Sequence, residues 1–284
     1  MPAEVRVVDD FVAADRLARL YGALRAWPEI PHGLFWIDVA RVERHAAGDP
    51  SPAAWLAPHV GELAGPLLDI LVGLVDLLPA ACRGGGALEL WTKRVDEVAD
   101  RVFLHRDTHS GPKPEGAPAR PLAATILHVG PDRPLAGGDT VFAMDDPPSD
   151  ALIARDKTRL ELAEVWSLAR SWLPVPRRAG RLVVFDGARP HFVAPLAEPA
   201  LETPRITLLV NAWAERPVPA EGDGGSPCLV RPDEFRALCR MRTGEMRALV
   251  SLLHRIEVEG DELAAMVSAC QAIARRMRRG QRQA

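Results

Sequence analysis

The sequence predicts an α+β protein with a jelly-roll core of short strands, flanked by N- and C-terminal helices. Runs rich in Val, Ile, Thr and aromatic residues fill the middle of the chain, and turns containing Gly or Pro separate them. Short strands at this spacing are typical of a jelly-roll barrel. Apolar residues at helical spacing precede and follow this region. The predicted strands lie at 88–95, 122–129, 137–142, 180–186, 191–193 and 203–213.

Helices are predicted on both sides of these strands and between two of them. Residues 10–27 follow a short N-terminal strand and have apolar residues at helical spacing, with Asp10 as the expected N-cap. Residues 52–80 predict one or two further helices, and 150–172 predict an amphipathic helix. Helices in these places would cover the strands and complete a core.

The length and composition allow one large domain with additions. The chain has 284 residues, of which 48% are hydrophobic, so it can bury a sizeable core. We expect a single domain over 1–225, with its jelly-roll at about 87–215 and a helical insertion at about 150–172. A C-terminal helical extension is expected over 226–284.

Charge, apolar runs and cysteines argue against several classes of protein. The net charge of −3 gives no electrostatic reason to expect a nucleic-acid or anionic-membrane partner. The most apolar run, 67–78, is shorter than the roughly 20 residues of a membrane span and is interrupted by Asp69 and Asp76. The N-terminus lacks the apolar region of a signal peptide. The four cysteines have no CxxC spacing and are expected to be free thiols in a cytoplasmic protein.

The most informative motif is His105-Arg-Asp107, followed by a distant His191. In an extended segment residues two apart point to the same side, so the imidazole and the carboxylate can reach one metal ion. A second histidine from another strand would complete two His and one carboxylate on one face of the metal. This ligand set, with open positions opposite, suits non-haem Fe(II) and its chemistry with O2.

A second pair of polar residues, Arg205 and Thr207, is also two apart on a predicted strand. Both side chains would therefore face one pocket. The planar guanidinium of arginine matches a carboxylate in a bidentate manner.

The order of these motifs resembles the Fe(II)/2-oxoglutarate-dependent dioxygenases, in particular their prolyl-4-hydroxylase-like branch. The motifs are HxD, GGxxxF at 137–142, GxLxxFxxxxxH at 180–191, and Arg-x-Thr fourteen residues after the distal histidine. The resemblance covers about 87–215, with a weaker echo at 5–26. It implies a double-stranded β-helix, the cupin-like form of the jelly-roll.

The resemblance also implies a role for each site residue. His105, Asp107 and His191 would be the iron ligands, while Arg205 would hold the distal carboxylate of 2-oxoglutarate with help from Thr207. The group at the 1-carboxylate end stays open, and the candidates are Lys93, Trp91 and Thr125.

The same resemblance implies the reaction. O2 would be the second co-substrate, succinate and CO2 the products, and ascorbate is expected to help. Because the carboxylate ligand Asp107 is present, hydroxylation is favoured over halogenation, which needs that position for a halide.

Two other classes of function and two classes of substrate stay open at this point. A metal-dependent hydrolase could use His105, Asp107 and His109, and a cupin-like binding protein would have no turnover. For a dioxygenase, a small amino-acid-like or natural-product molecule is the first expectation and a peptidyl residue the second. The Pro- and Gly-rich segment 108–121 leaves directly from the metal site, so we expect it to act as a lid over the substrate. The sequence sets no oligomeric state.

Overall fold

The structure is a computed structural model, and the description covers most of the chain up to residue 216. The described residues are 4–27, 30, 32, 35–83, 85–95, 102–107, 120–131, 137–145, 147–156, 161–195 and 204–216. The predicted extension over 226–284, residue His109 and most of the predicted lid lie outside these residues. The boundaries of the predicted domains therefore stay predictions.

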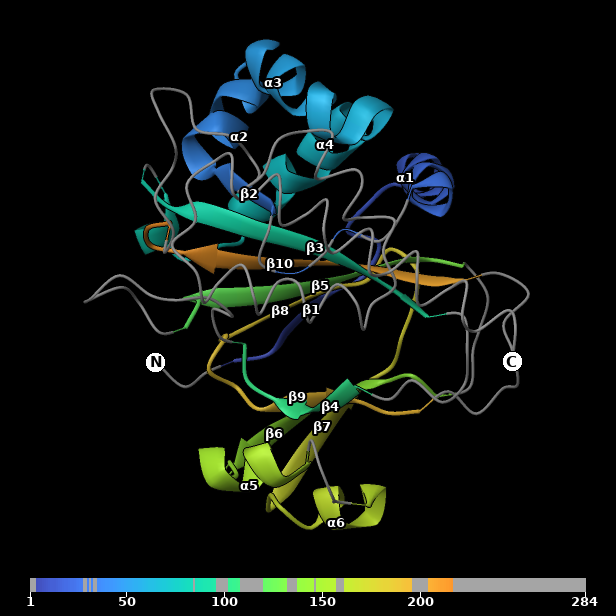
Figure 1. Cartoon of the computed structure of the whole chain (residues 1–284), viewed down its shortest axis with the longest axis vertical. Coiled ribbons are helices and arrows are strands. Elements are labelled where there is room, and N and C mark those ends of the chain that lie inside the picture. Colours follow the sequence, from blue (N-terminus) through green and yellow to red (C-terminus); the bar gives the residue numbers. More distant parts are fainter. Residues whose placement is uncertain are drawn as a thin grey trace, which may run out of the picture.

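Two antiparallel sheets lie face to face and form the core of the molecule (Figure 1). The six-stranded sheet has the order β1 (Arg6–Val8), β8 (Leu182–Phe185), β5 (Ala123–Gly130), β10 (Arg205–Trp213), β3 (Ala87–Val95) and β2 (Phe35–Asp38). The four-stranded sheet has the order β4 (Val102–His105), β9 (His191–Val193), β6 (Thr140–Asp145) and β7 (Ser171–Val175). This order confirms the predicted α+β jelly-roll. The strands form two sheets and not a closed barrel.

Helices cover the outer face of the six-stranded sheet (Figure 1). They are α1 (Ala14–Ala26), α2 (Val39–Ala46), α3 (Ser51–Val60) and α4 (Ala64–Val75), with short 3-10 turns η1 (Gly61–Leu63) and η2 (Ala80–Cys82). The largest hydrophobic cluster lies between these helices and the sheet, where it includes Leu208, Val210 and Ala212 of β10. Leu209, which lies between Leu208 and Val210 in the sequence, packs instead against the hydrophobic cluster between the two sheets. Because strand side chains alternate, the odd-numbered residues of β10 face the four-stranded sheet.

The helical segment Ser51–Val75 is long and apolar enough to cross a membrane by length and composition alone. It has 25 residues and a mean hydropathy of 1.3, so it is longer than the apolar run at 67–78 suggested. Over half of its most apolar window, 56%, is buried inside the protein. Leu67, Leu71 and Leu74 belong to the core cluster that packs on the six-stranded sheet, so the segment serves here as part of the core.

The region 150–172 differs from the single amphipathic helix that was predicted. It contains two short helices, α5 (Asp150–Asp156) and α6 (Leu162–Trp166), and the strand β7 begins at Ser171. Prolines made β7 hard to predict, since Pro174 lies inside it. Proline is tolerated there because β7 is the edge strand of its sheet and pairs with β6 alone.

The prediction that Asp10 caps the first helix was wrong. Helix α1 begins at Ala14, and its N-cap Ala13 has no side chain that could accept a hydrogen bond. Asp10 lies in a turn with a φ of 52°, and Arg178 donates to its carboxylate (3.1 Å).

Strand β2 and helix α2, which follows it directly, were not predicted at all.

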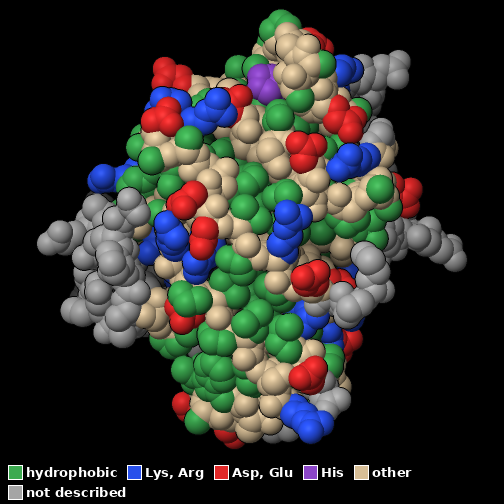
Figure 2. Space-filling view, turned by 180° about the vertical axis from the view of Figure 1, so that it is seen from behind, with side chains coloured by type: hydrophobic (Ala, Val, Ile, Leu, Met, Phe, Trp, Pro, Cys, Tyr) green, Lys and Arg blue, Asp and Glu red, His purple; other side chains and the backbone are tan. Residues whose placement is uncertain are grey.

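Figure 2 shows the face of the molecule that lies behind the view of Figure 1. Basic and acidic side chains are interspersed there among hydrophobic and other polar ones. An arrangement of this kind presents no extended surface of one charge to a partner on the described part of that face.

Candidate metal centre

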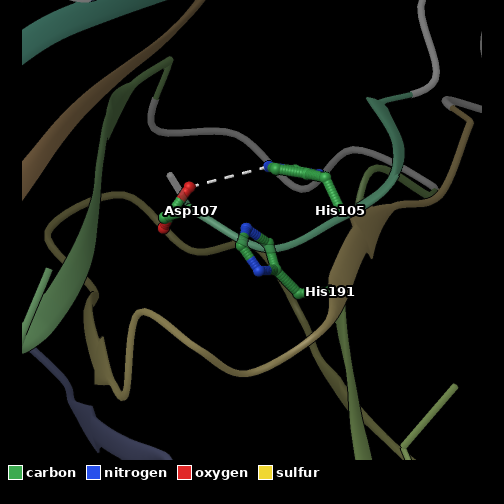
Figure 3. Close-up of side chains that lie close together, drawn as sticks. All are labelled: His105, Asp107 and His191. Atoms are coloured by element: carbon green, nitrogen blue, oxygen red, sulfur yellow. Dashed lines mark ion pairs between the residues drawn. The ribbon is translucent and has the colours of Figure 1, made fainter. Parts of the chain in front are cut away.

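Three side chains predicted to bind a metal come together on the four-stranded sheet. His105 ends β4, and it is the register partner of His191, the first residue of β9. Asp107 follows β4 two residues later, and its backbone N–H donates to Gly187 O (3.1 Å). One potential ligand atom from each of the three side chains lies within 4.8 Å of the other two. The three side chains point toward one another (Figure 3), with 3.8 Å between His105 Nε2 and Asp107 Oδ1.

Both imidazoles are oriented by hydrogen bonds on their far side. His105 Nδ1 donates to Phe103 O (2.7 Å), and His191 Nδ1 donates to Arg189 O (3.1 Å). In the neutral form each ring then carries its lone pair on Nε2. A ring nitrogen fixed in this way is the usual state of a metal-binding histidine.

Burial adjusts the protonation of this cluster. The ring of His191 packs against Phe185 and Phe142, with ring centroids 4.8 Å and 5.7 Å away. Burial lowers its pKa to about 4, so the imidazole of His191 is neutral at ordinary pH and its Nε2 lone pair is available to a metal ion. Burial also raises the pKa of Asp107, although the neighbouring His105 opposes this shift. A bound cation would stabilise the carboxylate, and two neutral imidazoles with one carboxylate fit the ligand preference of Fe(II).

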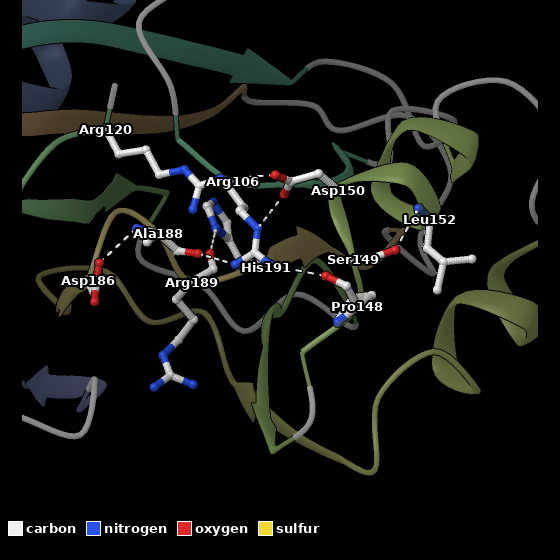
Figure 4. A network of polar contacts seen from close by, with 10 residues as sticks. All are labelled: Arg106, Arg120, Pro148, Ser149, Asp150, Leu152, Asp186, Ala188, Arg189 and His191. Carbon is white, nitrogen blue, oxygen red and sulfur yellow. Dashed lines mark hydrogen bonds and ion pairs between the residues drawn. The ribbon is translucent and has the colours of Figure 1, made fainter. Parts of the chain in front are cut away.

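The residue between the two ligands of the HxD motif, Arg106, ties this segment to its surroundings (Figure 4). Its guanidinium donates to Asp150 Oδ1 (2.9 Å), to Pro148 O (2.9 Å) and to Ala188 O. Arg120 donates to the other oxygen of the same carboxylate (3.1 Å). The strand end that carries the HxD motif is thus fixed to the start of α5 and to the turn before β9.

We expect Arg106→Lys to weaken metal binding about tenfold without unfolding the protein. A lysine carries the charge but cannot make three directed hydrogen bonds from one plane, so the neighbouring ligands lose their support. Losses of about 10–100-fold are typical when groups that orient metal ligands are removed. Dialysis against a range of metal concentrations measures the affinity. Arg19→Lys, in an exposed ion pair on α1, is the matched control and should have no effect.

A second group of buried polar side chains lies on the six-stranded sheet. Arg205, Thr207 and His128 are all buried, and Thr207 and His128 are register partners on β10 and β5. Arg205 Nε, Thr207 Oγ1 and both ring nitrogens of His128 have no hydrogen-bond partner among the described residues. Within the described chain Arg205 has no ion pair, and burial lowers its pKa to about 10, with repulsion from Arg177 adding to the effect. An arginine and a hydroxyl buried in this way form a ready site for a carboxylate.

The register of the strands reduces the number of candidate residues for binding the 1-carboxylate of 2-oxoglutarate. Lys93 is the register partner of Thr207, and Trp91 is the partner of Leu209, so both share the inward face. Thr125 is the register partner of Val210, whose side chain faces the helices. The Thr125 hydroxyl donates to Val210 O (3.1 Å), which removes Thr125 as a candidate. His128, in contrast, is an inward-facing residue, because it is the register partner of Thr207.

The burial of two neutral histidines predicts a loss of stability in acid. Burial lowers the pKa of His128 well below 6.5 and that of His191 to about 4. Below about pH 6.5 the unfolded chain binds protons that the folded chain does not, so folding weakens as the pH falls. The loss should be about 1.4 kcal/mol per pH unit for each histidine in the metal-free protein.

Urea unfolding of the metal-free protein between pH 6.5 and 4.5 measures this slope. His128→Phe should reduce the slope by about 1.4 kcal/mol per pH unit, because one of the two groups is gone. The control is His45→Gln, on the surface helix α2. An identical slope in the His128 variant and the wild type would contradict the argument.

Comparison with known proteins gives structural likeness only. No family model matches the sequence, and no curated protein matches it. Among solved structures, the chain is similar to HygX from Streptomyces hygroscopicus with nickel and 2-oxoglutarate bound, at 14% identity over 75% of this chain and 82% of that chain (TM-score 0.44). It is similar to a 2OG-Fe(II) oxygenase family oxidoreductase from Burkholderia pseudomallei, at 15% identity over 76% and 86% of the two chains (TM-score 0.45). It is also similar to a prolyl-4-hydroxylase from Pseudomonas putida, at 19% identity over 75% and 89% (TM-score 0.36).

The fold and the site together define a two-sheet jelly-roll protein with two histidines and one carboxylate gathered on its smaller sheet. Of the three solved structures named above, one is described as a 2OG-Fe(II) oxygenase family member and one has nickel and 2-oxoglutarate bound. Because their TM-scores lie below 0.5, the function has to be argued from the side chains of the site.

Proposed function

We propose that this protein is an Fe(II)/2-oxoglutarate-dependent dioxygenase that hydroxylates a C–H bond of a small molecule. The observation that carries the proposal is the pairing of two sites that suit these two ligands. His105, Asp107 and His191 offer a facial set of ligand atoms for iron. Arg205 and Thr207 offer a buried cation and hydroxyl for the distal carboxylate of 2-oxoglutarate.

Each residue has a defined task in this proposal. His105 and His191 present Nε2, and Asp107 presents a carboxylate oxygen, while Arg205 fixes the far end of the co-substrate. When bound, Fe(II) and 2-oxoglutarate supply O2 activation coupled to oxidative decarboxylation, with succinate and CO2 as products. Phe142 and Phe185 shield one side of the His191 ring from water.

Lys93 is proposed as an additional group for the co-substrate, because its register position places it beside Thr207. His128 is on the other side of Thr207 and is held neutral by burial, so it can donate one hydrogen bond to a carboxylate.

A small molecule is favoured as the primary substrate. Among the structures that this chain resembles, HygX is known with hygromycin B bound, which is a small molecule. A peptidyl substrate is the second possibility that the assay below includes. A cytoplasmic location stays a prediction.

The test is a succinate-release assay under O2 with Fe(II), 2-oxoglutarate and ascorbate. Wild-type protein should form succinate only when both iron and 2-oxoglutarate are present, and a panel of small molecules and peptides should stimulate it selectively. A hydrolase would act without 2-oxoglutarate, and a binding protein would form no succinate at all. Either of these results would contradict the proposed function.

A further inference from the structure

An asparagine without partners lies deep in the molecule. Asn211 of β10 is fully buried, and its Nδ2 and Oδ1 atoms both lack a hydrogen-bond partner among the described residues. A buried carboxamide in this state costs free energy, because both its donors and its acceptor have lost water. A ligand that supplies both a hydrogen-bond acceptor and a hydrogen-bond donor would satisfy this carboxamide.

The position of Asn211 is opposite the metal centre. In the six-stranded sheet, the register row runs from Phe185 through Ala124 and Asn211 to Glu89. The Phe185 ring is in contact with His191, with ring centroids 4.8 Å apart. Because Asn211 is an odd-numbered residue of β10, its side chain shares the face of Leu209, which packs toward the four-stranded sheet.

A carboxylate and an imidazole accompany Asn211 on this row. Glu89 is fully buried. Its Oε1 atom lies 3.1 Å from His32 Nε2, and Trp213 Nε1 donates a hydrogen bond to its Oε2 atom (3.3 Å). The side chain of His32 is about one-third exposed (35%) and its ring packs on Trp91, with ring centroids 4.4 Å apart. The pair therefore links a buried negative group to the surface.

We propose that Asn211, Glu89 and His32 form the subsite for the primary substrate, and that it takes a neutral or cationic group rich in hydroxyls or amines. This inference rests on the proposed function, because it assumes that the oxidised molecule lies beside the metal. Asn211 donates to and accepts from adjacent hydroxyl or amino groups of the substrate. Glu89 and His32 set the preference for its charge.

The charges around the subsite exclude an anionic group. The Glu89 carboxylate is fully buried and lies 3.1 Å from His32 Nε2. A carboxylate or phosphate on the substrate beside Asn211 would be repelled by the Glu89 carboxylate, whereas a hydroxyl or an ammonium group would be stabilised by it.

Three sugars of similar size that carry a positive, no or a negative charge test the proposal. Glucosamine, glucose and glucuronate are titrated by calorimetry into the full chain loaded with Ni(II) and 2-oxoglutarate. We expect glucosamine to bind at least tenfold more tightly than glucuronate, with glucose between them. Binding of Ni(II) and 2-oxoglutarate to the protein is measured first. If neither binds, the proposed function is contradicted. The order of the three sugar affinities then tests the subsite independently.

Two variants separate the parts of the subsite. Glu89→Gln should reduce the ratio of glucosamine to glucuronate affinity at least fivefold, because it removes the charge and keeps the shape. Asn211→Leu should weaken glucose and glucosamine equally, by about tenfold, with no change in their ratio. Its melting temperature should stay level or rise, since an apolar group of similar shape replaces an unpaired polar one.

Thr125→Val is the matched control, because Thr125 belongs to the same sheet and its hydroxyl donates to the backbone. It should leave all three affinities unchanged. The inference is overturned if wild-type protein does not bind glucosamine, if glucuronate binds as tightly as glucosamine, or if both subsite variants keep the wild-type affinities. A lower melting temperature of Asn211→Leu with unchanged affinity would assign Asn211 a purely structural role.

Discussion

His191→Ala should abolish stoichiometric metal binding and with it the turnover of 2-oxoglutarate. The variant removes one of three ligand atoms that lie within 4.8 Å of one another, and two groups are left to hold the ion. Removing groups that only support metal ligands already costs about 10–100-fold in affinity, so the loss of a ligand should cost about a hundredfold or more. His105→Ala should have the same effect, because His105 is the register partner of His191.

Metal content after dialysis, measured by atomic emission, and succinate release under O2 together check this prediction. His109→Ala is the informative control. In the proposed dioxygenase it should keep most of the bound metal and most of the activity. In the alternative hydrolase, which would use His105, Asp107 and His109, it would lose both, while His191→Ala would keep them. Full activity of the His191 variant would therefore overturn the assignment of the metal centre.

The long strands and the gathering of His105, Asp107 and His191 could be predicted because local patterns determine them. β3, β5 and β10 are runs of 8–9 residues bounded by turns, and the structure places each within a few residues of the predicted range. The HxD spacing places two ligands on one side of a strand end, whatever the remaining fold is. The order of the motifs along the chain then indicated which distant histidine completes the set.

The elements that were missed depend on contacts that the sequence does not reveal. β2 has four residues and pairs with β3, and β7 contains a proline that only an edge position tolerates. The strand β5 is buried at every position, so its sequence has no polar alternation to tell one face from the other. Glu89 and Asn211 were also missed, although the spacing of two from Trp91 on β3 could have placed Glu89 on the inward face.

Arg205→Met should weaken 2-oxoglutarate binding at least tenfold while it leaves the stability of the protein level or raises it. The guanidinium is buried, has no ion pair among the described residues, and has its pKa lowered to about 10 chiefly by that burial. A charge in this situation costs folding free energy, because burial disfavours the charged form. Methionine fills a similar volume without that cost. A merely structural arginine would give the opposite result, which is a fall in the melting temperature.

The expected size of the binding effect follows from the lost contact. A hydrogen bond to a charged group contributes about 1.5–3 kcal/mol, and about 1.4 kcal/mol corresponds to a tenfold change in affinity. The KM for 2-oxoglutarate should therefore rise at least about tenfold in Arg205→Met, and Arg205→Lys should lie between it and the wild type, because lysine keeps the charge and loses the fork. Thr207→Val should raise the KM by a smaller factor, since it removes a neutral hydroxyl. Calorimetric titration of 2-oxoglutarate into the Ni(II)-loaded variants checks the affinity independently of turnover. An unchanged affinity in Arg205→Met would place the co-substrate elsewhere, and a matching fall in melting temperature would show that Arg205 serves the fold.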